Sequence, residues 1–378
     1  MGVSAGRAAA AGRAMARHLA DTGYGPCEPS ILQPAAIFLD LSGEEIRSRM
    51  FLTSDPGGAE LCLRPEYTIP VCRDYLASQA DAPASYSYFG PVFRHRSNGS
   101  GESLQVGFES FGRSDKEAAD AEILTLALEA ARAAEGPPLL VRIGDTGLFE
   151  ALLDKLQLSP ALRGRIARGH ARGDSLDRIF APNANGANSD HSGVLAALEG
   201  VDKAGALALV EDLLSIAGIS PVGGRSANEI AERFLEQSSL KASAGVSAEV
   251  RDVIGRFLRI EGNIDQASEE MRALFGEAGL DMSSVLDVFD TRFEIIFGYA
   301  AARGLDVTTL RFSAGFARHI DYYTGFVFEA HDPTRADARP VIGGGRYDRL
   351  MTRLGAPKEI PAVGAAIWCE RLFVEDAP

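Results

Sequence analysis

The chain has 378 residues, of which 46% are hydrophobic and 24% are charged. This balance is typical of a folded globular protein and excludes a disordered chain. Fifty-two acidic residues outnumber 38 basic ones, for a formal net charge of −14. A negative field of this size repels polyanions and disfavours nucleic acid as the main partner.

Cysteine usage and the N-terminus indicate where the protein works. The four cysteines lie far apart, with no histidine nearby at metal-ligand spacing, so we expect neither a metal site nor disulfides. The alanine-rich N-terminus is interrupted by Arg7, Arg13 and Arg17, which indicates a helix rather than a signal peptide. No window reaches the ~20 apolar residues of a membrane span. We therefore expect a cytoplasmic protein that needs no cofactor.

Two hairpins are predicted in the first third of the chain. Residues 50–52 and 61–63 are short apolar runs separated by the turn-forming sequence SDPGG. Residues 86–94 alternate in strand fashion, the turn formers of SNGSGES follow, and residues 104–111 resume a strand. Each pair of strands is expected to be antiparallel.

A helical middle separates these strands from a second group. Residues 115–134 carry apolar side chains at helical spacing. After a short strand at 139–143, the signals are almost wholly helical from 146 to about 302, except for the polar run 182–190. Strand character then returns at 310–317, 326–330 and 362–366. A terminal helix that carries Glu370 and Arg371 follows.

Strands at both ends around a helical middle favour an α+β fold with an insertion over a doubly wound sheet. We expect residues 1–145 to form the first part of the core, 146–302 a mainly helical insertion, and 303–378 the second part of the core.

A glycine run near the C-terminus invites comparison with phosphate-binding loops. The segment Gly343-Gly344-Gly345-Arg346-Tyr347-Asp348 lacks both the P-loop ending and the strand–GxGxxG–helix arrangement. By itself it is interpreted as a tight turn, because glycine chiefly supplies unusual backbone angles.

Four separated segments resemble, in order, segments of histidyl-tRNA synthetase. They are LRPEYT at 63–68, FGPVFRH at 89–95, RHIDYYTG at 318–325 with VFE at 327–329, and GGRYD at 344–348. The resemblance extends from about Gly23 to Phe373 and weakens through the helical middle. It implies a class II aminoacyl-tRNA synthetase-like antiparallel sheet flanked by helices, normally in a homodimer.

The same resemblance implies a histidine pocket, vestigial or regulatory, without catalytic residues. Glu66 matches the family's carboxylate for the ligand α-ammonium, helped by Thr68 and Gln105, because a buried cation requires an anion and oriented acceptors. Arg318 matches the arginine that faces the ligand carboxylate, and Glu109 with two tyrosines matches positions around the imidazole. The implied set is Glu66, Thr68, Arg94, Gln105, Glu109, Arg318, Tyr322 and Tyr323.

Each of these residues has a structural alternative that the sequence leaves open. Glu66 can cap a helix or pair with Arg64, and Tyr322 and Tyr323 can be ordinary strand aromatics.

Three departures from the synthetase pattern bear on function. Arg96 stands where the synthetases have a glutamate that reads the adenine amino group, and the hairpin tip after it is short and lacks further basic residues. AVGAAIWCER at 362–371 resembles the last class II motif, but Trp368 replaces the glycine three residues before the adenine-stacking arginine, here Arg371. An indole would fill the adenine slot, unless it points into the core instead.

A histidyl-tRNA synthetase continues after this arginine into an anticodon-binding domain of roughly one further domain's length, whereas this chain stops at Pro378. The combination resembles the regulatory subunits of short-form ATP phosphoribosyltransferase. That resemblance implies an allosteric, non-catalytic protein of histidine biosynthesis. It would form a dimer within a hetero-octamer, activate the catalytic subunit, and make it sensitive to L-histidine.

Two alternatives stay open. One is a free-standing enzyme that forms histidyl-adenylate, supported by the retained Arg94, Arg318 and Arg371. The other is a tRNA-binding regulator, which the acidic charge disfavours.

Overall fold

The computed structural model describes residues 2–41, 48–80, 83–96, 100–171, 173–180, 246–318, 322–335 and 339–373. The chain divides into two compact units. One comprises Met1–Leu152, Ala171–Gly173 and Arg256–Pro378, and the other comprises Leu153–His170 and Asp174–Gly255. Both sheets and the candidate site belong to the first unit. The domain boundaries predicted at residues 146 and 303 stay a prediction.

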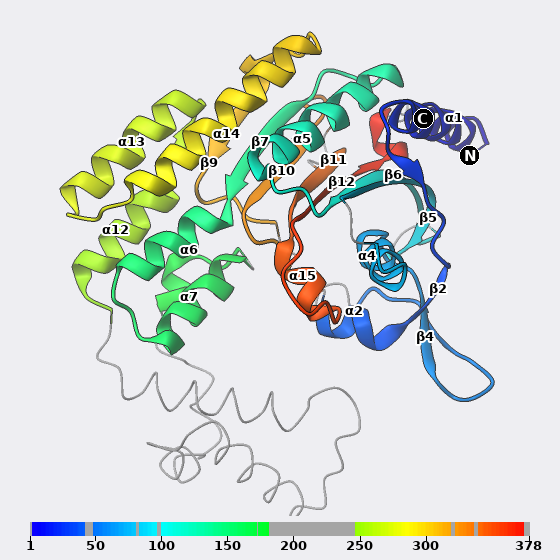
Figure 1. Cartoon of the computed structure of the whole chain (residues 1–378), viewed down its shortest axis with the longest axis horizontal. Coiled ribbons are helices and arrows are strands. Elements are labelled where there is room, and N and C mark those ends of the chain that lie inside the picture. The colour runs from blue at the N-terminus through cyan, green and yellow to red at the C-terminus, as the bar shows by residue number, and fades with distance from the viewer. Residues whose placement is uncertain are drawn as a thin grey trace, which may run out of the picture. The chain divides into compact units, whose positions relative to one another are not determined.

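Strands lie toward both ends of the chain, and most of the described residues between them are helical, which confirms the predicted α+β class (Figure 1). The strands are β1 (Gly25–Pro26), β2 (Leu32–Pro34), β3 (Leu52–Ser54), β4 (Glu60–Leu63), β5 (Ala84–Phe93), β6 (Glu102–Phe111), β7 (Leu140–Asp145), β8 (Glu261–Gly262), β9 (Leu310–Ser313), β10 (Phe326–His331), β11 (Ile342–Arg346) and β12 (Ala362–Trp368). The α-helices are α1 (Gly2–Asp21), α2 (Ala35–Leu41), α4 (Thr68–Ala77), α5 (Lys116–Ala133), α6 (Thr146–Lys155), α7 (Pro160–Ala171), α8 (Leu176–Phe180), α12 (Ala248–Leu258), α13 (Ile264–Glu277), α14 (Ser283–Ala302) and α15 (Asp348–Arg353). Among the described residues, η2 (Val307–Thr309) and η3 (Cys369–Leu372) are 3-10 turns.

The larger sheet has the strand order β1-β5-β6-β12-β11-β10-β7-β9-β8, and the smaller one has the order β2-β4-β3. Neighbours are antiparallel except for β1 with β5 and β7 with β9. The sheet is therefore mixed, although mostly antiparallel. The two predicted hairpins, β3–β4 and β5–β6, are confirmed. Because β12 pairs with β6 and β11, strands from the two ends of the chain form one sheet.

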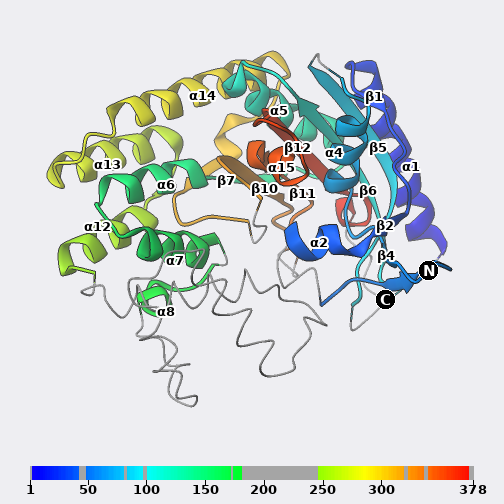
Figure 2. The ribbon, with the colours of Figure 1, turned by 60° about the horizontal axis from the view of Figure 1, so that its bottom comes forward.

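Helices cover the two faces of the larger sheet differently. On one face, α5 contacts β11 and β12, α1 runs alongside β5 and β6, and α14 packs on α5 (Figure 2). Figure 1 shows α4 and α15 on the opposite side. Side chains alternate along β6: Phe108 packs edge-on against Tyr24, which follows α1, whereas Phe111 stacks on Tyr75 of α4. Odd-numbered positions of β6 therefore face α4.

The glycine run Gly343–Gly345 is not a tight turn, so that interpretation is wrong. It lies within β11, a buried strand between β10 and β12. Glycine weakens a strand, but here the neighbours leave no room for a side chain. A Cβ on Gly344 would lie 2.6 Å from the carbonyl oxygen of Gly364 and 2.7 Å from the ring of Phe328. Close packing explains the glycines.

Near the C-terminus, the predicted helix around Glu370 and Arg371 is the short 3-10 turn η3. The polar run predicted at 182–190 and residues 97–99 of the predicted hairpin tip lie outside the described residues.

Candidate functional site

The sheet face toward α4 has a floor of bare backbone. Strand register places five glycines of β5, β6, β11 and β12 on this face, and we call them the glycine floor: Gly90, Gly107, Gly343, Gly345 and Gly364. A Cβ on any of them would come closer than 3.0 Å to a side chain above it, a distance that real Cβ atoms essentially never show. These side chains are Tyr67, Tyr88, Arg318, Tyr323 and Glu109, in the order of the glycines. Polar groups therefore lie directly on the strands.

Glu109 of β6 is the centre of this polar cluster. Its Oε1 accepts hydrogen bonds from the hydroxyls of Thr68 (2.9 Å) and Tyr88 (3.2 Å), and its Oε2 accepts one from Tyr347. The side chain is 1% exposed. Burial raises the pKa of Glu109 to about 8, although the hydrogen bonds from Tyr347 and Thr68 oppose the shift. At neutral pH most molecules therefore carry a proton on this carboxyl.

Glu66 lies just before α4 and caps it. Its Oε2 accepts the backbone N–H of Thr68 at 2.7 Å, and its Oε1 accepts that of Ile69 at 2.9 Å. Pro70 follows in the first turn, where a missing N–H costs little. Burial raises the pKa of Glu66, while the Ile69 N–H and the charge of Arg94 favour its ionised form.

The capping alternative considered for Glu66 is therefore what the structure shows, and Arg64 has other partners. Arg64 donates to the carbonyl oxygens of Pro29 and Pro91 and to the hydroxyl of Tyr67. Arg94 donates from Nε to the carbonyl oxygen of Pro65 at 2.8 Å, which holds its charge near the start of α4.

Arg318 and two tyrosines lie at the β10–β11 side of the floor. Arg318 donates from Nη1 to the hydroxyl of Tyr323 (2.9 Å) and from Nε to Oε1 of Glu329 (3.1 Å). The ring of Tyr322 lies 5.2 Å from that of Tyr323 and 5.8 Å from that of Tyr347, centroid to centroid. Because Tyr347 also binds Glu109, these aromatic rings connect the guanidinium end of the cluster with its carboxyl end.

Gln105 has an unsatisfied acceptor. It lies four residues before Glu109 on β6, so both side chains project from the same face. Gln105 is 1% exposed, and within the described part of the chain its Oε1 has no hydrogen-bond donor. A buried amide oxygen without a donor is costly, and the ammonium group of a bound ligand would supply one.

The structure thus brings all eight predicted residues to one face of the sheet. Direct contacts link Glu66 through Thr68 to Glu109, and Arg318 to Tyr323. Their assignment to histidine stays a prediction.

Trp368 lies on the same face as the candidate pocket. It is the register partner of Gln105 in the β6–β12 pair, so both side chains project toward the glycine floor. The indole is 6% exposed, and the guanidinium of Arg371 lies 4.4 Å from its ring centroid, a cation–π contact. The indole therefore does not project toward α5. Arg96, the first departure from the synthetase pattern, donates to the hydroxyl of Ser103 at 2.8 Å.

Sequence reasoning missed two tyrosines that hold Glu109. Tyr88 directly precedes the FGPVFRH segment, and Tyr347 belongs to GGRYD. Strand alternation was an available signal for Tyr88, since it puts that side chain on the same face as Gly90. No signal in the sequence pairs Tyr347 with Glu109, because they are 238 residues apart.

The pKa of Glu109 predicts a pH-dependent stability that glutamine should remove. Folded protein holds the proton up to about pH 8, whereas an ordinary glutamate releases it near 4.5. Between these values the folded state binds more protons than the unfolded chain. The stability from this carboxyl is therefore complete below the lower value and is lost as pH rises through the upper one.

As pH rises through that window, the wild type should lose about 1.4 kcal/mol of unfolding free energy per pH unit relative to the Glu109→Gln variant. Urea denaturation of both proteins at several pH values between 5 and 9 measures this difference. A difference that stays constant with pH would contradict the prediction.

Across the described ranges, no group of three or more His, Cys, Asp or Glu side chains could hold a metal ion. None of the helices that the structure describes is long and apolar enough to cross a membrane.

The fold and the site together define a class II synthetase-like core with a buried cluster of polar groups on one face of its sheet. A family model described as histidyl-tRNA synthetase matches residues 3–218 and 203–372. Solved structures agree in fold. An ATP phosphoribosyltransferase regulatory subunit/histidyl-tRNA synthetase from Bacillus halodurans has a TM-score of 0.66 at 21% identity, covering 97% of this chain and 78% of that one. A histidyl-tRNA synthetase from Nostoc has a TM-score of 0.62 at 16% identity, covering 97% and 70%.

Curated relatives are closer in sequence. The chain is 39% identical over 349 residues to proteins from Brucella ovis and Brucella abortus named ATP phosphoribosyltransferase regulatory subunit, with 91% of each chain covered. The chain belongs to the family of ATP phosphoribosyltransferase regulatory subunits. The predicted resemblance and the predicted fold are confirmed.

Proposed function

We propose that this chain is the histidine-sensing regulatory subunit of a short-form ATP phosphoribosyltransferase. It binds the catalytic subunit, activates it, and makes it sensitive to feedback by L-histidine. The observation that carries the proposal is the 39% identity to named regulatory subunits over 91% of both chains. By family resemblance, the chain works in the cytoplasm as a dimer within a hetero-octamer, and the transfer chemistry belongs to the partner.

The polar cluster supports a zwitterionic ligand that carries a ring. Glu66 and the unsatisfied Oε1 of Gln105 suit an ammonium group, because a buried cation needs an anion and oriented acceptors. Arg318 suits a carboxylate. The protonated Glu109 and the rings beside Arg318 suit an imidazole, which can both donate and accept hydrogen bonds.

Contacts around the retained arginines favour the regulator over an adenylate-forming enzyme. Arg371 stacks on Trp368 and donates to the carbonyl oxygen of Pro340 at 2.7 Å. Arg94 uses its Nε on Pro65, and Arg318 is bound to Glu329 and Tyr323. An indole that stacks on an arginine of its own chain competes with a purine for the same guanidinium face.

Regulation requires more than tight binding. Histidine can inhibit the complex only if it binds the active and inactive states with different affinity, typically by about 1–3 kcal/mol. A ligand with equal affinity for both states changes nothing.

The test is a reconstitution with purified proteins. This chain is mixed with a short-form catalytic subunit from the same source, and phosphoribosyl-ATP formation is measured with and without histidine. We expect activation by the chain, inhibition of the mixture by histidine, and no ATP–pyrophosphate exchange by the chain alone. Histidine-dependent exchange without any effect on the partner would establish the adenylating enzyme instead.

A pocket variant locates the histidine site in the same assay. Arg318→Gln removes the cation expected to face the ligand carboxylate, while its surroundings can still hydrogen-bond the amide. We expect this variant to activate the catalytic subunit but to require at least tenfold more histidine for inhibition, because a charge-assisted hydrogen bond is lost. Unchanged feedback would place the histidine site elsewhere, for example at a subunit boundary.

A further inference from the structure

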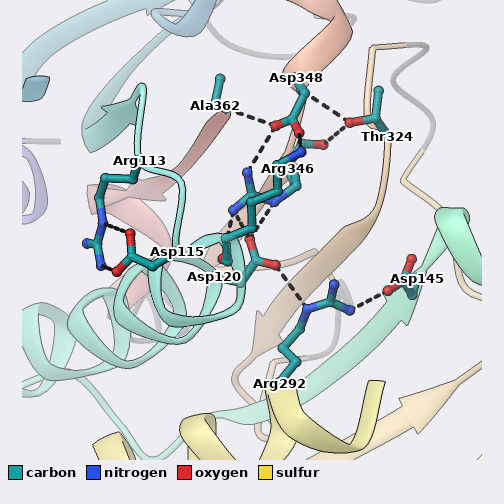
Figure 3. A network of polar contacts seen from close by, with 10 residues as sticks. Arg113, Asp115, Asp120, Asp145, Arg292, Thr324, Arg346, Asp348 and Ala362 are labelled. Atoms are coloured by element: carbon teal, nitrogen blue, oxygen red, sulfur yellow. Dashed lines mark hydrogen bonds and ion pairs between the residues drawn. The ribbon is translucent and has the colours of Figure 1, made fainter. Parts of the chain in front are cut away.

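Five buried charges of alternating sign form a chain, which we call the ion chain (Figure 3). Arg292 of α14 pairs with Asp145 at 2.5 Å and with Asp120 at 3.0 Å. Arg346 of β11 pairs with Asp120 at 2.7 Å and with Asp348 at 3.0 Å. Every one of these side chains is at most 9% exposed. The ion chain therefore joins α14, α5, the end of β7, β11 and the start of α15.

Both ends of the ion chain hold one short loop. The loop, residues 322–325, precedes β10. Thr324 donates its N–H to the carbonyl oxygen of Arg346 (2.9 Å), and its Oγ1 accepts the N–H of Asp348 (3.1 Å), as Figure 3 shows for the side chain. At the other end, the carbonyl oxygen of Gly325 accepts from the N–H (3.0 Å) and hydroxyl (3.2 Å) of Thr146, the neighbour of Asp145.

This loop carries Tyr322 and Tyr323, whose positions decide the shape of the candidate pocket. Tyr323 binds Arg318, and Tyr322 packs edge-on against Tyr347. Tyr347 itself lies between Arg346 and Asp348, the last two members of the ion chain, and reaches Glu109. Three aromatic side chains of the pocket thus belong either to the loop held by the ion chain or to the segment that contains its last two members.

We propose that Arg292 and Thr324 are positioning residues of the ligand pocket. Arg292 holds the two anchor points, Asp145–Thr146 and Arg346–Asp348, at a fixed separation through Asp120, and Thr324 fixes the tyrosine loop between them. The proposal deepens the proposed function, because the ligand whose affinity is expected to change is histidine. It also makes α14 the helix through which a displacement would reach the tyrosines.

The electrostatics of the ion chain suit a rigid link rather than a mobile one. Removing one partner of a buried ion pair leaves an uncompensated charge and is strongly destabilising, so the charges have little freedom to separate. Asp145 is further fixed because its Oδ1 caps α6 by accepting the N–H of Gly147 at 2.8 Å. Asp348 similarly accepts the N–H of Ala362 at 2.9 Å.

The test compares two threonine variants. Thr324→Val keeps the shape of the side chain but removes the acceptor of the Asp348 N–H. The matched control is Thr125→Val, which removes a buried hydroxyl that donates to the Ala121 carbonyl oxygen within α5. Histidine titrations are followed by the emission of Trp368, the one tryptophan of the chain, which lies on the pocket face. Hydrogen exchange by mass spectrometry reports on the loop without any ligand.

We expect Thr324→Val to weaken histidine binding about tenfold, because the loop loses a hydrogen bond that orders it before the ligand binds. Leaving a buried N–H without its acceptor typically changes an equilibrium constant by about this factor. Exchange should increase in peptides that cover 322–327 and 346–350 but not in those from β5 and β6. Thr125→Val should lower the melting temperature about as much as Thr324→Val does. It should leave histidine affinity and hydrogen exchange in the loop as in the wild type. Arg292→Lys, which keeps the charge but not the two-sided contact, should loosen the same peptides.

The proposal would be overturned if the loop exchanged at the wild-type rate in both Thr324→Val and Arg292→Lys. Uniformly faster exchange across the whole sheet would also overturn it. If the wild-type chain gives no histidine response at all, the proposed function fails, while the exchange pattern still decides whether these residues position the loop.

Discussion

Replacing Asp120 with alanine should lower the free energy of unfolding by about 3–5 kcal/mol, the usual cost of removing one partner from a buried ion pair. Asp120 is 0% exposed and is the central anion of the ion chain, between Arg292 and Arg346. Without it, two buried guanidinium groups face each other across a space that no carboxylate fills. This loss is a large share of the stability of a typical protein.

Asp115→Ala is the matched control for this experiment. Asp115 also pairs with an arginine, Arg113, through two hydrogen bonds of 3.0 Å and 2.6 Å (Figure 3). Its side chain is 56% exposed, so its removal should cost no more than about 1 kcal/mol. Urea denaturation of the three proteins measures both values. Equal losses for the two variants would show that the ion chain contributes no more than a surface pair.

Gly364→Ala should reduce histidine affinity by more than about 100-fold, because one methyl group would displace the carboxyl at the centre of the site. A Cβ on Gly364 would collide with Oε2 of Glu109 and would lie 2.8 Å from the carbonyl oxygen of Phe108. The backbone of two paired strands cannot move away, so Glu109 must leave its position over the floor. Its hydrogen bonds with Thr68 and Tyr347 would be lost with it.

Gly298→Ala provides the same chemical change where space is available. Gly298 lies in α14, and nothing lies within 4 Å of a Cβ built on it. This variant should bind histidine normally and gain up to about 1 kcal/mol of stability, because alanine is the better helix former. Calorimetric titration of both variants with histidine checks the pair. Near-normal binding by folded Gly364→Ala would remove Glu109 from the proposed site.

A site built on bare strands has a consequence for regulation. Polar groups on the glycine floor already contact the strand backbone and cannot move closer to it, so ligand-induced motion must come from the elements above the sheet. The loop with Tyr322 and Tyr323 is one of these, and its hydrogen bonds lead to α14 through the ion chain. Coupling between two sites requires such an element with two arrangements, each favoured by one ligand.

Much of the fold could be predicted from the sequence alone, where local chemistry decides structure. The hairpins β3–β4 and β5–β6 follow from turn formers between alternating runs, and α5 follows from apolar residues at helical spacing. The family could be predicted as well, because four motifs in fixed order constrain the core far more than composition does. These features depend on residues that are neighbours in the sequence.

Only the tertiary structure decided how distant residues meet. Gly343–Gly345 has the local character of a turn, but pairing with β10 and β12 makes it a strand, because the side chains above it require bare backbone. Glu66 had two local alternatives, and the start of α4 selected capping. Asp120 and Arg346 are 226 residues apart, and no periodicity in one sequence pairs them. Burial makes this contact a stronger constraint than a surface pair would be, since the low dielectric inside a protein strengthens the attraction between opposite charges.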